Sequence, residues 1–177
     1  MSKPIVICII GPSGSGKDTA AAYLEREMGY NRICSYTTRP MREDEKDGRE
    51  HLFVKEPPMR LSCLAYTQYG GYEYWTEYDQ LVLTKPNVYV IDEHGMETLW
   101  REHKHDYWLM RIDITADEKV RRMRGVTEDR IKRDNERTAL PPRRCCHAYW
   151  EIANDYSEIS LWHTLDSIAE NCFDALC

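Results

Sequence analysis

The chain reads Gly11-Pro12-Ser13-Gly14-Ser15-Gly16-Lys17-Asp18-Thr19 directly after the apolar run 4–10 and directly before a helix-forming segment that starts at Ala20. Three glycines let the backbone curl so that successive N–H groups converge on an anion at a helix N-terminus. Lys17 adds a positive charge for the β- and γ-phosphates. The order of strand, loop and helix therefore predicts an ATP-binding site, whose residues we expect to be Gly11, Ser13, Gly14, Ser15, Gly16, Lys17, Asp18 and Thr19.

The residue that follows the lysine departs from the usual loop pattern. A Ser or Thr hydroxyl normally stands there and reaches Mg²⁺, whereas this chain has Asp18 followed by Thr19. Either the Thr19 hydroxyl takes the metal or the Asp18 carboxylate acts on it through a water. We expect Mg²⁺ to accompany ATP at this loop, with both residues as candidate ligands.

Length and composition indicate one domain with a sizeable core, since the chain has 177 residues. No apolar run approaches the roughly 18 residues of a membrane span, and the apolar part of the N-terminus is too short for a signal peptide. The seven cysteines are odd in number and include no Cys-x-x-Cys pair. We therefore expect reduced thiols in a cytoplasmic protein, with a redox or metal role for Cys145-Cys146, beside His147, as the alternative.

The net charge of −6 argues against general nucleic-acid binding, because domains that bind nucleic acid are usually basic. Positive charge is nevertheless clustered in two groups. One contains Arg39, Arg42 and Arg49, and the other contains Arg121, Arg122, Arg124, Arg130, Lys132, Arg133 and Arg137. An acidic protein with two such groups and a phosphate loop suits small polyanions. We expect nucleotides as its partners, and neither nucleic acid nor a membrane.

Apolar strands alternate with helical segments along the chain. This order predicts an α/β fold with a P-loop NTPase-type parallel sheet flanked by helices, and with sites at the carboxyl ends of the strands. We expect strands at 4–10, 31–36, 87–92, 107–114 and 158–161, and a hairpin of 61–69 and 72–76 around Gly70-Gly71. We expect helices at 16–28, 77–83, 93–103, 116–124, 128–137 and 165–176.

A second motif follows the loop and reads Thr37-Thr38-Arg39-Pro40-Met41-Arg42-Glu43-Asp44-Glu45-Lys46-Asp47-Gly48-Arg49-Glu50-His51-Leu52-Phe53. It resembles the guanylate kinase signature, in which Thr-Ser/Thr-Arg is followed by basic, acidic, Gly, Tyr and Phe residues at fixed intervals. Every fixed position matches except the Tyr, which is His51 here. With the phosphate loop and the aromatic hairpin that ends Glu73-Tyr74-Trp75-Thr76, the chain resembles the guanylate kinase-like branch of the nucleoside monophosphate kinases over most of its length.

This resemblance implies ATP-dependent phosphoryl transfer to a nucleoside monophosphate by a single domain, 1–177. Its core would comprise 1–34, 81–119 and 138–177, with a small β-rich acceptor-binding lobe at about 35–80 and a short lid at about 120–137. Such a reaction depends on positioning two polyanions and neutralising their charge. The residues that we expect to serve catalysis are Lys17, Arg39, Arg122 and Arg133.

The acceptor phosphate needs its own cationic grip. Arginine forks suit bidentate binding of a phosphate, and we assign this role to Arg39 and Arg42. The alternative is a solvated loop with surface ion pairs to Glu43, Asp44 and Glu45. By resemblance, Tyr74 and the residue at His51 complete the grip, and Ser35 and Glu45 support the pocket. The expected acceptor-binding residues are therefore Ser35, Arg39, Arg42, Glu45, His51, Tyr74 and Thr76.

Asp92 closes an apolar strand where the family places an acid near Mg²⁺, although a carboxylate there also caps a following helix. The expected metal ligands are thus Thr19, Asp18 and Asp92. The arginine-rich segment resembles the family's lid, which closes over the phosphates and excludes water, and Arg122 falls on a lid arginine. A second expected arginine aligns with Val126, so Arg124, Arg133 or Arg137 would replace it.

The resemblance breaks at the positions that recognise the base. Guanylate kinases read guanine with a Glu nine residues before the phosphate-binding Tyr and with an Asp two residues before the Walker-type Asp. Those positions are Ala65 and Val90 here, so guanine would leave buried donors unpaired at roughly 1–3 kcal/mol each. We expect altered base specificity, with Ser35 retained and Gln68 as an amide that suits another base.

Two other functions stay open. Gly16-Lys17-Asp18 also resembles the ribose 1,5-bisphosphate phosphokinases, which carry Asp after the lysine, although the complete Thr-Thr-Arg-Pro-x-Arg loop is more typical of enzymes with nucleotide acceptors. Guanylate kinase-like domains also serve as non-catalytic peptide-binding modules. Those usually have a damaged phosphate loop, whereas Lys17 and the three loop glycines are present here. The sequence predicts no particular oligomeric state.

Overall fold

The computed structural model of the protein describes residues 3–43, 45–49, 51–56, 63–136 and 145–174, with side chains up to residue 170. Within these ranges, five strands form a parallel central sheet in the order β2-β7-β1-β8-β9. The strands are β1 (Ile5–Ile10), β2 (Asn31–Ile33), β7 (Asn87–Val90), β8 (Trp108–Thr115) and β9 (Ala148–Ala153). The predicted fold class is confirmed.

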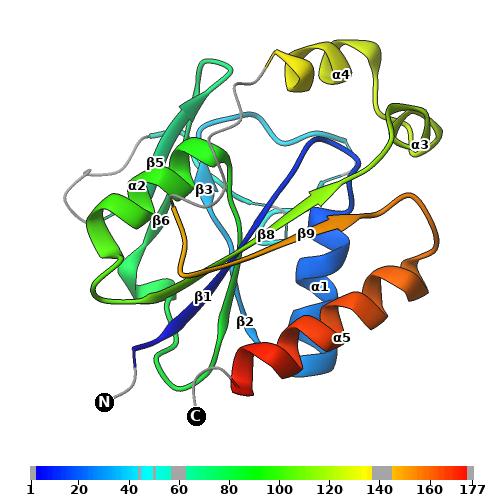
Figure 1. Ribbon diagram of the computed structural model, residues 1–177. Helices are drawn as coiled ribbons and strands as arrows, with labels where there is room; N and C mark the ends of the chain where they lie inside the picture. Colours follow the sequence, from blue (N-terminus) through cyan, green and yellow to red (C-terminus); the bar gives the residue numbers. More distant parts are fainter. Residues whose placement is uncertain (1–2, 44, 50, 57–62, 137–144, 175–177) are drawn as a thin grey trace.

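The apolar sequence of β1 is explained by helices on both faces of the sheet. Ile7 and Ile9 pack into one core cluster with residues of α1 (Lys17–Met28) and α5 (Glu158–Asp174). Val6, Cys8 and Ile10 point the other way, into a cluster with α2 (Glu93–His103). Because alternate side chains of a strand face opposite sides, a strand covered on both faces must be apolar throughout. Figure 1 shows α1 and α5 side by side on one face and α2 on the other.

A second, smaller sheet stands beside the first. Among the described residues its order is β4-β3-β6-β5, from β3 (Tyr36–Thr37), β4 (Leu52–Phe53), β5 (Cys63–Tyr69) and β6 (Tyr72–Glu77). The predicted hairpin around Gly70-Gly71 is confirmed, and both glycines have positive φ, 61° and 81°. Glycine adopts this conformation without steric cost, which suits a two-residue turn. A 3-10 turn, η2 (Tyr78–Gln80), leads back to the central sheet.

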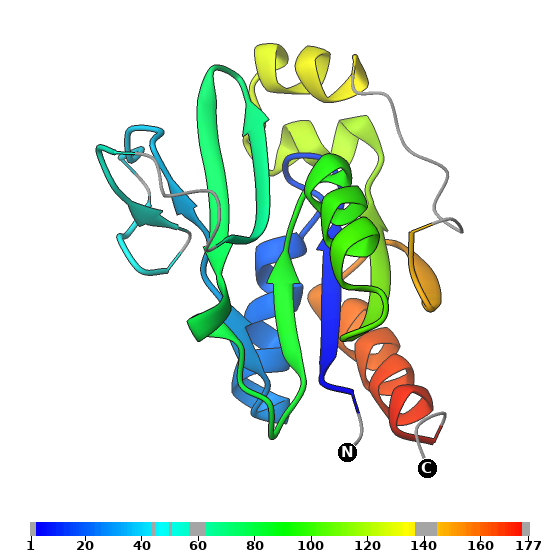
Figure 2. The same ribbon diagram turned by 90° about the vertical axis from the view of Figure 1, so that its left-hand side faces the viewer.

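Two short helices lie over the carboxyl ends of the central strands. They are α3 (Glu118–Met123) and α4 (Glu128–Asn135), which are separated by Gly125 with φ 82°. Figure 2 shows α4 and the tip of the β5–β6 hairpin at the same end of the molecule as the loop between β1 and α1. This arrangement brings three segments that are distant in sequence to one end of the sheet.

The structure corrects three of the expected elements. The expected strand at 158–161 is wrong, because Glu158 begins α5, where Leu161, Leu165 and Ile168 are buried at helical spacing. The last strand is instead β9, an edge strand that the sequence analysis missed. The expected strand at 31–36 divides between the two sheets, as β2 and the start of β3. The expected helix at 77–83 is only the three-residue turn η2.

Five cysteines whose side chains the structure describes lie outside any disulfide: Cys8, Cys34, Cys63, Cys145 and Cys146. Across the described part of the chain, no group of three or more His, Cys, Asp or Glu side chains is placed to hold a metal ion. The metal alternative for Cys145-Cys146 therefore receives no support from the structure. No described helix is long and apolar enough to cross a bilayer.

The packing of Gly11 against β8 generates a prediction for stability. A Cβ atom added at Gly11 would lie 2.0 Å from the carbonyl oxygen of Ile114, and φ there is 155°. We expect Gly11→Ala to lower the free energy of unfolding by more than about 3 kcal/mol through overpacking and strain. Gly29→Ala is the control, because φ is 68° but nothing lies within 4 Å of the added atom, and it should cost about 1–2 kcal/mol. Equal losses in urea denaturation would contradict the packing argument.

Candidate active site

Three side chains hold three consecutive carbonyl oxygens of the phosphate loop. Arg121 Nε donates to the Ser13 oxygen at 2.7 Å, Arg124 Nη1 to the Gly14 oxygen at 3.0 Å, and Asn154 Nδ2 to the Ser15 oxygen at 2.8 Å. We call these three residues the carbonyl clamp. Arg121 lies in α3, Arg124 is the C-cap residue of that helix, and Asn154 follows β9. The curvature of the loop is therefore set by contacts from far along the chain.

The glycines of the loop allow this close approach. A Cβ atom at Gly14 would lie 2.4 Å from Val126 Cγ2, and one at Gly16 would lie 2.4 Å from Asn154 Nδ2. Gly16 is also the N-cap residue that precedes α1, with φ 101°. The sequence predicts that these glycines bend the backbone around an anion. In the structure, Gly14 also makes room for Val126, and Gly16 makes room for Asn154 of the carbonyl clamp.

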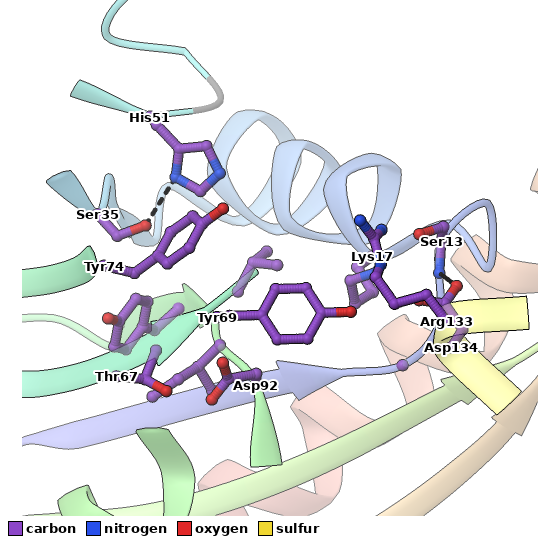
Figure 3. Close-up of a pocket in the computed structure, with 14 residues that line it drawn as sticks. Ser13, Lys17, Ser35, His51, Thr67, Tyr69, Tyr74, Asp92, Arg133 and Asp134 are labelled. Carbon is purple, nitrogen blue, oxygen red and sulfur yellow. Dashed lines mark hydrogen bonds between the residues drawn. The ribbon is translucent and has the colours of Figure 1, made fainter. Parts of the chain in front are cut away.

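Lys17 lies between two neighbouring cavities. The first, which we call the central cavity, has a volume of about 190 Å³, and Lys17, His51, Tyr69, Tyr74, Asp92 and Arg133 are among its lining residues. Figure 3 shows these side chains converging from the phosphate loop, the β5–β6 hairpin, α4, the residue before β4 and the segment after β7. The second, the arginine cavity, also measures about 190 Å³ and is lined by Arg39, Arg42 and Glu45 together with Lys17, His51 and Tyr74. The Lys17 ammonium donates to the Pro12 carbonyl at 2.9 Å.

Glu45 organises the two arginines of the acceptor motif. Its carboxylate accepts from Arg39 Nη1 and Nη2 at 2.9 and 2.8 Å, and from the Arg42 backbone N–H at 2.9 Å. Burial works against both charges, but the hydrogen bonds outweigh it, so the pKa of Arg39 is raised and the pKa of Glu45 is lowered. Arg39 is only 8 % exposed. The solvated-loop alternative therefore does not describe Arg39, which Glu45 holds in place at the wall of the arginine cavity.

His51 occupies the position of the signature tyrosine and lines both cavities. Its Nδ1 is 2.9 Å from Ser35 Oγ, and its ring stands edge-on to Tyr74 with centroids 5.5 Å apart. Burial lowers the pKa of His51, and the nearby charge of Arg39 lowers it further. The imidazole is therefore neutral at neutral pH, and it offers a hydrogen-bonding nitrogen where a tyrosine would offer a hydroxyl.

Asp92 performs the capping role that was its alternative interpretation. Its Oδ1 accepts from the Gly95 N–H at 2.6 Å and so caps α2. The same side chain also lines the central cavity. Asp18 is also a lining residue of the arginine cavity. Together with Thr19 it lines a further cavity of about 370 Å³, beside Arg124, Asn154 and Glu158. The Asp18 side chain is 61 % exposed and pairs with Arg32 at 3.0 Å.

The structure brings only some of the expected residues to the two cavities. Arg133 lines the central cavity, and its guanidinium lies 5.2 Å from the centre of the Tyr69 ring. Arg122 instead pairs with Glu118 at 2.6 Å and with Glu128, and it lines neither the central nor the arginine cavity. Thr76 is fully buried, where its hydroxyl donates to Tyr89. A catalytic role for Arg122 and an acceptor contact for Thr76 stay predictions that this arrangement does not favour.

The base-binding expectation also changes in one detail. Gln68 is exposed, and its amide donates to Glu73 at 3.2 Å rather than reaching a cavity. Thr67, the preceding residue, lines the central cavity together with Val90. Adjacent residues of a strand face opposite sides, so Thr67 faces the central cavity and Gln68 faces away from it. The clamp residue Asn154 was missed altogether, since a lone asparagine carries no signal in the sequence.

The parallel sheet, the phosphate loop and the paired arginines define a P-loop protein of the nucleoside monophosphate kinase type. The chain belongs to the guanylate kinase family, since the family model described as guanylate kinase matches residues 1–155. The guanylate kinase of Dechloromonas aromatica is 30 % identical over 131 residues, which cover 68 % of this chain and 65 % of that protein.

Other comparisons agree in part. The guanylate kinase of Bradyrhizobium diazoefficiens is 46 % identical over 54 residues, which cover 30 % of this chain and 25 % of that protein. These two alignments thus span less than two thirds of the relatives' own lengths. A crystal structure of guanylate kinase from Anaplasma phagocytophilum has the same fold, with a TM-score of 0.64 at 19 % identity over 99 % of this chain and 88 % of that one.

The lowered pKa of His51 predicts how stability depends on pH. The pKa of a histidine in an unfolded chain is about 6.5. Because the pKa of His51 is lower in the folded protein, the unfolded chain binds a proton at a higher pH than the folded protein does. Stability should therefore fall as the pH drops below about 6.5 toward the lowered folded value. Thermal unfolding at pH 7.5 and 5.5 should show a smaller acid loss for His51→Asn than for the wild type. The exposed His105 serves as control. His105→Asn should follow the wild type, and an equal acid loss in His51→Asn would refute the assignment.

Proposed function

We propose that this protein transfers the γ-phosphoryl group of ATP to a nucleoside monophosphate. The observation that carries the proposal is the position of Lys17, which belongs to the phosphate loop and lines both the central and the arginine cavity. A donor phosphate at the loop and an acceptor phosphate at Arg39 and Arg42 would both lie within reach of one ammonium group. Phosphoryl transfer depends on such positioning and charge neutralisation.

The roles of the residues follow from this arrangement. Arg39, oriented by Glu45, and Arg42 bind the acceptor phosphate. An oxygen of that phosphate attacks the γ-phosphorus, the bond from the γ-phosphorus to the bridging oxygen breaks, and ADP leaves. Lys17 and the loop amides stabilise the charge that develops. Arg133 lines the central cavity from the lid side and is the lid arginine that we assign to the transferring group. No covalent enzyme intermediate is needed.

Magnesium fits this proposal as a companion of ATP. Mg²⁺ is usually bound by one or two carboxylates together with substrate phosphates and water, which agrees with the lack of any larger acidic or histidine cluster in the described ranges. Asp92 lines the central cavity, and one of its carboxylate oxygens accepts a hydrogen bond from the Gly95 amide. We assign it to the metal's surroundings, with Asp18 and Thr19 as the remaining candidates. Bound Mg²⁺ would neutralise phosphate charge.

We also propose that the expected acceptor lobe, about 35–80, and lid, about 120–137, close on the remaining core when both substrates bind. The contact of Arg133 with Tyr69 supports this proposal, because it joins the lid helix to the hairpin of the lobe. Closure would exclude water from the transferring group. Family membership does not favour the ribose 1,5-bisphosphate alternative, and the organised loop does not favour a non-catalytic binding module.

The catalytic assignment predicts the behaviour of one lysine variant. Lys17→Ala should lower ATP-dependent turnover of a nucleoside monophosphate by about 10² or more, because a charge on the transferring group is lost. Its circular dichroism and melting temperature should stay close to the wild type. Lys85→Ala is the control, since Lys85 is exposed, donates to the Gly29 carbonyl and lines neither the central nor the arginine cavity. Wild-type turnover in Lys17→Ala would refute the proposed role of the loop.

The base of the acceptor is a finer part of the proposal. The relatives are guanylate kinases by name, which makes GMP the first acceptor to test. Ala65 is buried in β5 and Val90 lines the central cavity, where the family resemblance expects carboxylates. Neither side chain accepts a hydrogen bond from guanine, so we propose that the preference for guanine is weakened or replaced.

A substrate panel tests this part separately. ATP consumption should be measured with ribo- and deoxyribonucleoside monophosphates of all bases and with ribose 1,5-bisphosphate. We expect turnover that is not restricted to guanine, and we expect Val90→Asp to raise kcat/KM for GMP about tenfold by restoring one acceptor. Leu83→Asp, at a residue that is 69 % exposed, controls for added charge. Efficient turnover of GMP and dGMP alone by the wild type would overturn the altered preference and leave the kinase assignment intact.

A further inference from the structure

The phosphate loop already binds a carboxylate of its own chain. The Ser13 backbone N–H donates to Asp134 Oδ2 at 2.7 Å, and Arg121 Nη2 donates to the same oxygen at 2.6 Å. The side chains of Asp134 and Arg121 are 2 % and 5 % exposed. Figure 3 shows Ser13 and Asp134 in contact at the end of the central cavity near Lys17. A buried carboxylate is thus built into the part of the protein that is organised to bind phosphate.

The same helix reaches the acceptor side of the cleft. Arg133, next to Asp134 in α4, lies over the Tyr69 ring of the hairpin. The lid helix therefore contacts the loop through a negative charge and the hairpin through a positive one. Arg121 connects these contacts to the loop, since its Nε holds the Ser13 carbonyl while its Nη2 holds Asp134. The contact is a bridge of three partners rather than a single ion pair.

A phosphate that approaches this loop meets two obstacles. The Ser13 amide has one hydrogen to donate, and Asp134 accepts it. A carboxylate and a phosphate in this cavity also repel each other, and the repulsion is strong because buried charges are poorly screened by water. If Asp134 moves away, the Arg121 guanidinium loses its carboxylate partner. The oxygens of the arriving phosphate can then accept hydrogen bonds from the same guanidinium. One anion would then replace another at the same two donors.

We propose that Asp134 is a resident anion that competes with the donor phosphate for Ser13 and Arg121, and that it holds α4 on the loop until ATP displaces it. The inference rests on the proposed function, which makes ATP the donor. It assigns to Asp134 a role in setting donor affinity and lid position. A purely structural role for Asp134, as a support that orders Arg121 and the loop for nucleotide, predicts the opposite effect on affinity.

Two variants of Asp134 separate these roles. Asp134→Asn removes the charge but keeps an oxygen that accepts from Ser13, and Asp134→Ala removes both. The control is Asp129→Asn, which makes the same charge change at an exposed position of the same helix. Calorimetric titration with ATP and with inorganic tripolyphosphate should show about tenfold tighter binding in both Asp134 variants than in the control. Tripolyphosphate tests whether the gain concerns the phosphates rather than the base.

Hydrogen exchange without nucleotide provides a second measurement. Backbone amides of residues 118–135 should exchange faster in Asp134→Ala than in Asp129→Asn, because the lid helix is no longer held on the loop. Unchanged or weaker ATP binding in Asp134→Asn would overturn the inference. The proposed donor site would still stand in that case if the wild type binds ATP and Lys17→Ala does not. Lack of ATP binding by both the wild type and Asp134→Asn would overturn the inference and the proposed function together.

Discussion

The phosphate loop depends on the carbonyl clamp, in which Arg121, Arg124 and Asn154 hold three consecutive backbone oxygens. A glycine-rich segment has many accessible conformations and loses much entropy when it is ordered. Side-chain donors that bind its carbonyls, two of them buried (Arg121 and Asn154), select one of these conformations before any ligand arrives, which is the usual basis of preorganised binding. The phosphate loop, the segment around α3 and the edge of the central sheet after β9 are consequently connected by these contacts.

In this acidic chain, the arginine cavity has more cationic than anionic lining residues, because only some of the arginines are neutralised there. Glu45 holds Arg39 at the wall of the arginine cavity, whereas Glu118 and Glu128 occupy Arg122 outside both cavities. The number of arginines in a segment therefore says little about the charge that a substrate meets. Buried carboxylates position the useful guanidinium groups, and exposed carboxylates neutralise the others.

The sequence was sufficient for features that depend on local pattern. The apolar run of β1, the loop glycines and the Gly70-Gly71 turn each carry a strong local signal. The spacing of Arg39 and Arg42 indicated a phosphate-binding pair, but the sequence suggested only surface ion pairs to Glu45, whereas the Arg39–Glu45 pair is buried. The sequence was not sufficient for β9 and the start of α5, where a short edge strand precedes a long helix. The clamp contacts also escaped prediction, because their partners lie 108 to 139 residues apart in sequence and only tertiary packing selects them.

The position of Asn154 has a consequence for the order in which the protein acquires its site. The loop motif is complete at residue 19, but the Ser15 carbonyl receives its donor only from a residue that follows the last strand. During synthesis from the N-terminus, a chain of 150 residues would already contain the whole motif without the contact that shapes it. Contacts between such distant residues form late, because the intervening chain must first be ordered. Nucleotide binding would then report that the final strand has joined the sheet.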